Sequence, residues 1–276
     1  MIFTTLDTAQ HVEEADFIHL SRQIEACAKI FPDEMIVPQA IGGGVAAVTI
    51  PSFGRKLNHI VGFGMAGKVE KVDLETAQEL YSSKGIPTEV DLCPYADVSA
   101  LHTLASCGYT VNGFSNIYAR ELTDTDCQES DESGISISVV TRDRVSEFVR
   151  CSSEGFRDTG RPSMLLETLA QIAALRADTH LYFATIDGQI AGTAGLALIQ
   201  TSKGGVAHLY IDSTMPAYRG KGVQAALLRT RLSDARKCGY NLATVTARPS
   251  NVSARNTERA GFHLAYTRPT FSKRSE

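Results

Sequence analysis

The segment that most constrains the fold runs from Ile211 to Gln224 and reads IDSTMPAYRGKGVQ. It joins the end of a predicted strand to the start of a predicted helix through a turn with two glycines and two cations. Backbone N–H groups in such a turn are little obstructed by side chains, and they lie at the positive end of the helix dipole. The segment therefore predicts a site for phosphate groups.

The residues around this turn define its context. The alternation from Val206 to Thr214 predicts the strand, and the helix ends with Arg236 and Lys237 before Gly239. Two common nucleotide loops do not fit, because one needs GxGxxG with an acid about 20 residues later and the other needs GxxxxGK followed by Ser or Thr. The helix is indicated by apolar residues at helical spacing: Val223, Leu227, Leu228, Leu232 and Ala235.

Residues 134–276 resemble the GNAT superfamily of N-acetyltransferases, whose pyrophosphate loop reads Gln/Arg-x-x-Gly-x-Gly/Ala. The last position departs from this pattern, since it is Gln224. The residues that fit are Arg219, Gly220, Lys221, Gly222 and Val223.

The predicted order of elements also resembles this family. A hairpin precedes the loop, with strands at Leu181–Ile186 and Gln189–Ile199 joined at Asp187-Gly188, a dipeptide that favours two-residue turns. After the helix come a strand at Leu242–Thr246, a short helix within Pro249–Phe262, and a final strand through Leu264, Tyr266 and Phe271.

Length and composition agree with two soluble domains. A chain of 276 residues suggests about two domains of roughly 150 residues. The longest apolar stretch, Ile190–Ile199, is too short to cross a bilayer, and we expect a cytoplasmic protein. The six cysteines lack CxxC spacing and the histidines form no ligand pair, so we expect reduced thiols and no metal site.

Charge is distributed unevenly along the chain. Residues 1–122 carry a net charge of −7, residues 123–133 carry −5, and residues 134–276 carry +8. The basic half suits a polyanionic ligand such as coenzyme A, although the two halves could instead complement each other across an interface. The negative total charge and the lack of basic residues interleaved with aromatic residues argue against nucleic-acid binding.

The two halves also resemble each other. Lys84–Glu121 and Cys238–Arg274 each contain a strand, a proline, a Val-Ser-Ala helix, a Gly-aromatic pair and a final strand. We therefore interpret residues 1–122 as a degenerate GNAT-like domain, although any domain of strands and helices can give such echoes. The predicted fold class is α/β (α+β): two tandem GNAT-like domains, 1–122 and 134–276, each with a mixed, mostly antiparallel twisted sheet flanked by helices, joined by an acidic linker at 123–133.

The N-terminal copy lacks the phosphate loop. Its corresponding segment contains Gly62, Gly64 and Gly67, which match GxGxxG literally. The following helix is expected to begin near Asp73 rather than within the glycines, and no ribose-binding acid follows in a convincing βαβ unit. We therefore expect no dinucleotide site there.

The resemblance also implies roles for individual residues. The strand that ends at Thr214 is expected to splay from its neighbour, so that backbone groups of Asp212, Ser213 and Thr214 hold the pantetheine arm and polarise the thioester carbonyl. The cofactor would further contact the loop from Arg219 to Gln224, Asn256 and Ser250, while helix capping is the other interpretation of the last two residues.

The general base and acid are less well defined by the sequence. His208 stands where many members have a glutamate base, and a neutral imidazole suits that task, although a lone histidine on a strand is more often a packed residue. Thr257 stands where many members have a tyrosine acid. Tyr210, Tyr218 or Tyr266 could replace it, or water could protonate the thiolate.

The sequence leaves two functions open. The first is an acetyl-CoA-dependent N-acetyltransferase that acts on a small amine, amino acid or peptide, and the second is a non-catalytic acyl-CoA-binding regulatory or interaction protein. The acceptor site is expected between Val145–Arg176 and the first domain, whose acidic composition favours a cationic acceptor. The chain could act as a monomer with an internal pseudo-dimer, or as a homodimer.

Overall fold

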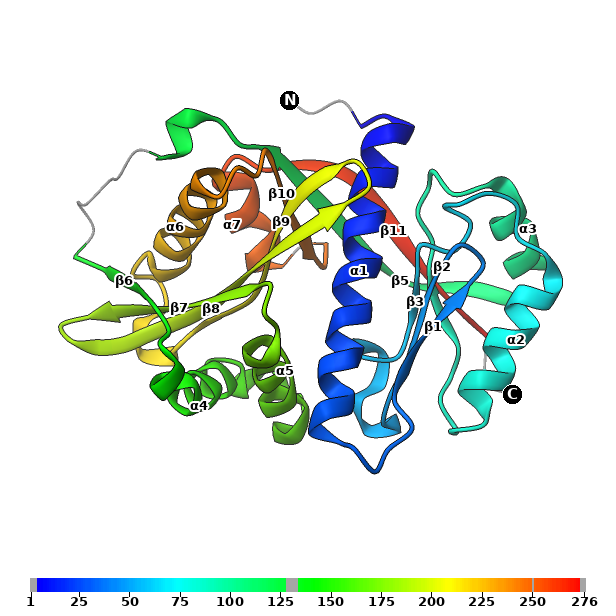
Figure 1. Cartoon of the computed structure of the whole chain (residues 1–276), viewed down its shortest axis with the longest axis horizontal. Coiled ribbons are helices and arrows are strands. Elements are labelled where there is room, and N and C mark those ends of the chain that lie inside the picture. Colours follow the sequence, from blue (N-terminus) through cyan, green and yellow to red (C-terminus); the bar gives the residue numbers. More distant parts are fainter. Residues whose placement is uncertain (1–3, 128–133, 250, 274–276) are drawn as a thin grey trace.

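The computed structural model describes residues 4–127, 134–249 and 251–273, and the strands within these ranges form one twisted sheet of eleven strands (Figure 1). Helices flank this sheet, and the helix α1 (Leu6–Ile30) lies between the two halves of the molecule. The strand order is β1-β2-β3-β4-β11-β5-β10-β9-β8-β7-β6. Most neighbouring strands are antiparallel, and the parallel pairs are β3 with β4 and β9 with β10.

The N-terminal half contains α1 and the first five strands. Thr5 caps α1, because its side chain accepts a hydrogen bond from the N–H of Thr8 at 3.2 Å. The other elements are β1 (Val37–Ile41), β2 (Gly44–Val48), the 3₁₀ segment η1 (Pro51–Lys56), β3 (Ile60–Val61), α2 (Lys71–Ser82), β4 (Glu89–Asp91), α3 (Val98–Ser106) and β5 (Tyr109–Glu121).

The C-terminal half repeats the succession of strand, glycine loop, helix, parallel strand, helix and strand. Its elements are η2 (Asp124–Cys127), β6 (Ser136–Val139), η3 (Arg142–Arg144), α4 (Val145–Gly155), η4 (Arg157–Thr159), α5 (Ser163–Leu175), β7 (Thr179–Ile186), β8 (Gln189–Thr201), β9 (Gly204–Thr214), η5 (Pro216–Tyr218), α6 (Val223–Lys237), β10 (Leu242–Ala247), α7 (Val252–Arg259) and β11 (His263–Lys273).

The structure confirms the fold predicted from the sequence. The predicted hairpin is β7 and β8, and its turn residues Asp187 and Gly188 have φ angles of 49° and 74°, as a two-residue hairpin turn requires. The helix after the second glycine turn begins at Val223, immediately after Gly222. The sheet is mixed, mostly antiparallel and flanked by helices, as expected for two tandem domains.

The two halves exchange their last strands, which the sequence did not indicate. Strand β5 pairs with β10 of the C-terminal half, where Tyr118 lies opposite Val245. Strand β11 pairs with β4 of the N-terminal half, where Phe271 lies opposite Val90. The two predicted sheets are therefore one continuous sheet, and the limits of the two predicted domains stay a prediction.

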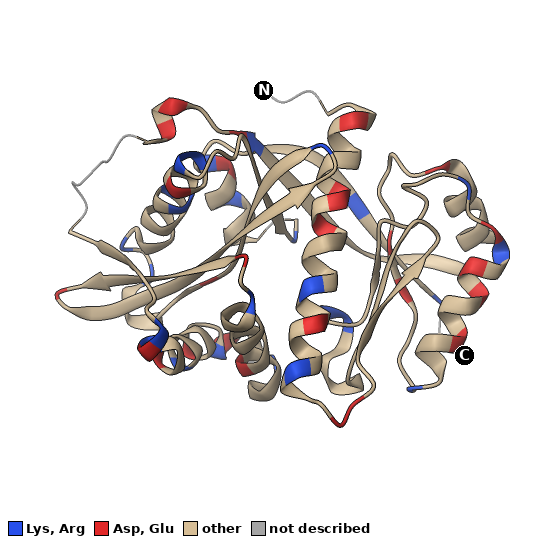
Figure 2. Cartoon of the chain, in the orientation of Figure 1, with Lys and Arg blue, Asp and Glu red and all other residues tan. Residues whose placement is uncertain are grey.

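Ion pairs hold the two halves together along α1. Asp7 pairs with Lys203, Arg22 pairs with Asp178 at 2.6 Å, and Asp16 pairs with Arg268 at 2.6 Å. Figure 2 shows acidic residues along the first part of this helix and residues of both signs along its second part. Two of these pairs join an acid of the N-terminal half to a base of the C-terminal half, whereas the pair of Arg22 with Asp178 has the opposite polarity.

The predicted acidic linker falls mainly on residues 128–133, which lie outside the described residues. Its first part is η2, where Asp124 accepts hydrogen bonds from Arg236 and Asp126 accepts one from Arg120. Within residues 4–127, 134–249 and 251–273, no helix has the length and apolar character needed to cross a membrane.

Candidate functional site

A cavity of about 1930 Å³ extends between the two halves and contains the predicted phosphate loop. Its walls come from β9, the N-terminus of α6, the end of β10 and α7 in the C-terminal half. The N-terminal half contributes α1, η1 and β4. A ligand in this cavity would therefore contact both halves of the chain.

The glycine loop offers unpaired backbone donors to this cavity. Gly220 and Gly222 have φ angles of 77° and 83°, in the left-handed region that favours glycine. Among the described residues, no side chain caps α6, and the N–H groups of Gly220, Gly222 and Val223 have no partner. A Cβ at Gly220 would meet no described atom within 4 Å, so the approach to these donors is open.

The two cations of the loop are held at its rim. Arg219 donates to the carboxylate of Asp158 at 2.7 Å and to the carbonyl of Gly155 at 3.3 Å. The ammonium group of Lys221 lies over the ring of Tyr218 at 5.0 Å. The Arg219–Asp158 pair is exposed, so its geometry costs little to break and Arg219 could turn toward an anion.

The structure brings two predicted cofactor contacts together. Asn256 on α7 donates a hydrogen bond to Gln224 on α6 at 2.6 Å, and both residues line the cavity. The side chain of Val223 is buried in the core, so only its backbone is available to a ligand. Ser250 lies outside the described residues.

Strand β9 bends and separates from β10 beside this loop. The two strands pair only from Val206 to His208, and the β8 register shifts after Tyr210, where Ile211 has a φ of 53°. This register shift is a β-bulge, a feature that bends a strand and leaves an extra residue unpaired. The splay predicted for the strand ending at Thr214 is therefore present.

A buried ion pair fixes the bulge. Arg231 of α6 is 0% exposed and donates to both carboxylate oxygens of Asp212, at 2.5 and 2.7 Å, and to the carbonyl of Gly195. The hydroxyl of Ser213 bonds that of Thr193 at 2.8 Å. The side chains of Asp212 and Ser213 are therefore engaged, and these residues would contact a ligand mainly through their backbone.

His208 is a neutral group at the cavity wall. It is 8% exposed, its Nδ1 lies 3.0 Å from the hydroxyl of Thr244, and its ring centroid lies 4.5 Å from that of His19. Burial, only partly opposed by the nearby Asp16, lowers the pKa of His208 to about 4. Its Nε2 makes no hydrogen bond with any described residue.

The candidate tyrosines differ in position. Tyr210 lines the cavity, its hydroxyl lies 2.9 Å from that of Thr179, and burial raises its pKa. Tyr218 also lines the cavity. Tyr266 is absent from the cavity wall and donates to Glu13 at 2.7 Å inside a separate apolar cluster, so the geometry does not bring it to the site.

Several residues of this cavity gave no signal in the sequence. Asp16 and His19 come from α1, Lys56 from η1, Arg161 from the segment before α5, and Arg248 from the residue after β10. These residues lie far apart in the sequence, so no motif joins them. They meet only because of the strand exchange and the position of α1.

Residues 142–262 match the model of the acetyltransferase (GNAT) family. This stretch of the C-terminal half is therefore similar to a GNAT domain. Its fold supports acyl transfer from acetyl-CoA, and GNAT acetyltransferases act on small amine or peptide acceptors. The GNAT match includes the loop from Arg219 to Gln224, the hairpin of β7 and β8, and α7.

Solved structures extend the likeness to both halves. A GCN5-related N-acetyltransferase from Kribbella flavida is 15% identical, with a TM-score of 0.69 over 97% of this chain and 96% of that one. A tandem GNAT protein from the clavulanic acid biosynthesis pathway is 12% identical, with a TM-score of 0.58 over 89% and 85%. A putative GNAT acetyltransferase from Novosphingobium aromaticivorans is 18% identical, with a TM-score of 0.52 over 93% and 99%.

These identities show a shared fold. No curated protein matches the sequence. Among the described residues, no group of three or more His, Cys, Asp or Glu side chains could hold a metal ion.

Proposed function

We propose that this protein is an acetyl-CoA-dependent N-acetyltransferase of the cytoplasm that acetylates a primary amine of a small molecule, amino acid or peptide. The observation that carries the proposal is the open glycine loop at the uncapped start of α6, which opens into the same cavity as the bulge of β9. An anion-binding helix start beside a splayed strand suits a ligand with a diphosphate and an extended arm.

The residues present fit this cofactor. The unpaired N–H groups of Gly220, Gly222 and Val223 would bind the diphosphate, and Arg219 and Lys221 would add charge. The amides of Gln224 and Asn256 lie beside these donors. The backbone from Asp212 to Thr214 would pair with the pantetheine arm, since β10 does not pair with β9 there. The bound cofactor supplies an activated acetyl thioester.

Amine acylation first requires a free lone pair. A lysine-like amine with a pKa of about 10.4 is protonated at pH 7, and removing its proton costs roughly 4 to 5 kcal/mol. His208 is neutral at this pH and could accept the proton through Nε2, directly or through water, if its Nδ1–H donates to Thr244. With its proton on His208, the amine nitrogen would be free to bond to the acyl carbon of the thioester that the cofactor supplies, with the thiolate of coenzyme A as the leaving group.

The bulge of β9 would stabilise the charge that develops on the carbonyl oxygen. A correctly aimed backbone N–H can be worth about 3 kcal/mol in such a reaction. The ion pair of the buried Arg231 with Asp212 keeps the backbone of the bulge in position, and so preorganises its N–H groups as donors to the carbonyl oxygen. The departing thiolate has a reference pKa near 8.5, so it leaves without a strong acid.

A second candidate function is acyl-CoA binding without turnover. Thr257 favours it, because this threonine is buried and its hydroxyl has no hydrogen-bond partner among the described residues. No acid therefore stands at the position where many relatives have a tyrosine. Positioning and oxyanion stabilisation can still carry most of the rate in such reactions, so we favour the enzyme.

The deciding experiment is a calorimetric titration of acetyl-CoA into the wild type and into an Arg219→Glu, Gly222→Asp double variant. We expect micromolar binding that the double variant loses. The control is Arg150→Glu on the exposed side of α4, which should bind normally. A panel of amines is then screened for thiol release, and binding without release from any amine would favour the second function.

A further inference from the structure

The cavity continues past the acyl site toward the N-terminal half, and this part of its wall carries five cations. They come from η1 (Arg55 and Lys56), the segment before α5 (Arg161), the residue after β10 (Arg248) and β11 (Arg268). The carboxylates that line the same part are Asp16 and Asp91. The charge of the lining is therefore positive, although residues 1–122 are acidic as a whole.

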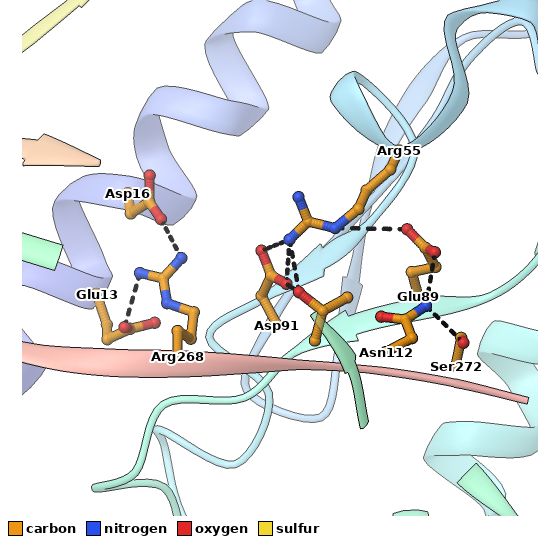
Figure 3. A network of polar contacts seen from close by, with 9 residues as sticks. Glu13, Asp16, Arg55, Glu89, Asp91, Asn112, Arg268 and Ser272 are labelled. Carbon is orange, nitrogen blue, oxygen red and sulfur yellow. Dashed lines mark hydrogen bonds and ion pairs between the residues drawn. The ribbon is translucent and has the colours of Figure 1, made fainter. Parts of the chain in front are cut away.

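Two of these cations are already neutralised, as Figure 3 shows. Arg268 donates to Asp16 at 2.6 Å and to Glu13 at 2.8 Å. Arg55 pairs with Asp91, whose other contact is the hydroxyl of Thr270. Glu89, which does not line the cavity, also forms an ion pair with Arg55, at 3.4 Å from its Nε. These two arginines have the partners that buried charges require.

The other three cations have no such partner. Within residues 4–127, 134–249 and 251–273, Lys56, Arg161 and Arg248 form no ion pair and no hydrogen bond of their side chains. All three residues line the cavity, and Asp16, whose charge acts on Lys56, is already paired with Arg268. The structure thus gathers three positive charges from three distant segments around one space.

The three groups lie close enough to disfavour one another. Desolvation in the cavity, followed by the charges of Arg161 and Arg55, lowers the pKa of Lys56 to about 8, although the carboxylate of Asp16 opposes this shift. Arg248 likewise contributes to lowering the pKa of Arg161, after burial. A bound anion would offset this repulsion and raise the pKa of Lys56 again. Lys56 and His208 line the same cavity, and the charge of Lys56 contributes to the lowered pKa of His208.

We propose that Lys56, Arg161 and Arg248 bind an anionic group, a carboxylate or a phosphate, on the acceptor, so that its amine is presented to β9 and His208. The inference rests on the proposed function and names its substrate class. It reverses the expectation of a cationic acceptor, which considered the composition of residues 1–122 rather than the side chains that face the cavity. Selection arises because an acceptor without the anion leaves these cations unpaired.

The first test measures anion binding without turnover. In the Arg219→Glu, Gly222→Asp background, which removes the loop site, 10 mM inorganic phosphate or 10 mM malonate should raise Tm by about 2 °C or more. Adding Lys56→Met and Arg161→Met should abolish the shift, whereas adding Lys29→Met, an exposed lysine at the end of α1, should preserve it. A shift that survives the loss of Lys56 and Arg161 overturns the proposal.

The second test compares matched acceptors by thiol release. Amino acids are set against their amides, and phosphoethanolamine is set against ethanolamine, which distinguishes a carboxylate from a phosphate. We expect the anionic member to have at least tenfold higher kcat/KM, mainly through KM. Lys56→Met should reduce this ratio about tenfold and leave the Kd of acetyl-CoA unchanged.

The outcomes separate the two proposals. Equal rates for anionic and neutral acceptors would contradict the anion site. Weaker binding of acetyl-CoA by Lys56→Met would also contradict it, because the three cations would then bind the cofactor. Absence of thiol release with every amine would contradict the enzyme, while a phosphate or malonate shift that depends on Lys56 would still support the anion site.

Discussion

The two halves of this chain each have a glycine-rich loop between a strand and a helix, and glycine has a different structural role in each loop. The loop at Gly62–Gly67 precedes α2, and the loop at Gly220–Gly222 precedes α6. Each follows a strand that is parallel to the next strand of its half. Their positions in the fold correspond, so the differences between them reflect local packing.

In the N-terminal loop, glycine allows close packing. A Cβ at Gly64 would lie 2.7 Å from the Cβ of Ala100, and the N–H of Gly64 donates to the carbonyl of Gly42 at 2.8 Å. Glu70 and Asp73 form a capping box that satisfies the start of α2. This packing closes the N-terminal loop around Gly64, whereas the C-terminal loop keeps unpaired donors and open space beside Gly220. A glycine pattern therefore predicts function only together with what surrounds it.

The largest expected effects come from the same substitution in the two loops. Gly64→Val should destabilise the fold by about 2 to 4 kcal/mol, because it overpacks against Ala100 at a positive φ, and should leave acetyl-CoA affinity unchanged. Gly220→Val should weaken acetyl-CoA at least tenfold, because it covers the donors, with less loss of stability. Urea unfolding and calorimetry measure the two effects, and a cofactor defect in Gly64→Val would break the comparison.

Histidines buried where the two halves meet should make the stability of the protein depend on pH, which neither loop should do. Burial lowers the pKa of His19, and that of His59 and His208 to about 4. An unfolded histidine titrates near 6.5, so the unfolded chain binds more protons between pH 6.5 and 4. Stability is therefore full above pH 6.5 and falls toward pH 4, by up to about 1 kcal/mol per histidine per pH unit.

This slope can be assigned by substitution. Urea unfolding at several pH values should give a shallower dependence for His59→Gln than for the wild type. Glu13, whose pKa burial raises, contributes in the opposite direction in both proteins and cancels from the difference. Parallel curves for the two proteins would show that His59 does not take part.

Removing the capping box should have a moderate effect. Glu70→Ala and Asp73→Ala should each cost about 1 kcal/mol of stability, since each exposes an N-terminal donor of α2. Neither should create a second acetyl-CoA site, because Gly64 remains packed against α3. A calorimetric stoichiometry of two in the double variant would show instead that capping alone closes the N-terminal loop.

The smallest effect concerns the rim of the C-terminal loop. Asp158→Ala releases Arg219 from an exposed ion pair, whose strength is about 0.2 to 1 kcal/mol. Acetyl-CoA should then bind up to about fivefold more tightly at low salt, and the gain should shrink as salt is added. Unchanged affinity at low salt would mean that Arg219 does not turn toward the cofactor.

Local features of this fold could be predicted from the sequence, and long-range ones could not. The hairpin and the limits of α6 were predicted correctly, because they depend on residues that favour a positive φ at their own positions. These residues are Asp187-Gly188, the glycines before α6 and Gly239. The alternation of β5 indicates a strand, but it does not say that Tyr118 lies opposite Val245 of the other half.

The same limit applies to the site. The loop is contiguous in sequence and could be found there, whereas Lys56, Arg161 and Arg248 meet only after the chain has folded. The partner of Tyr266 is Glu13, which is 253 positions away, so the local sequence around Tyr266 did not show that its hydroxyl is engaged in the core. Net charge of a segment likewise does not say which side chains face a cavity.

The strand exchange has a consequence for synthesis of the protein on the ribosome. Strand β4 has to wait for β11, which is near the end of the chain, before its outer edge is paired. While the second half is being translated, the first half exposes that edge, and β5 lacks both of its neighbours. The two halves therefore mature together after release, and a nascent chain stalled before residue 263 would hold two incomplete sheets rather than one finished domain.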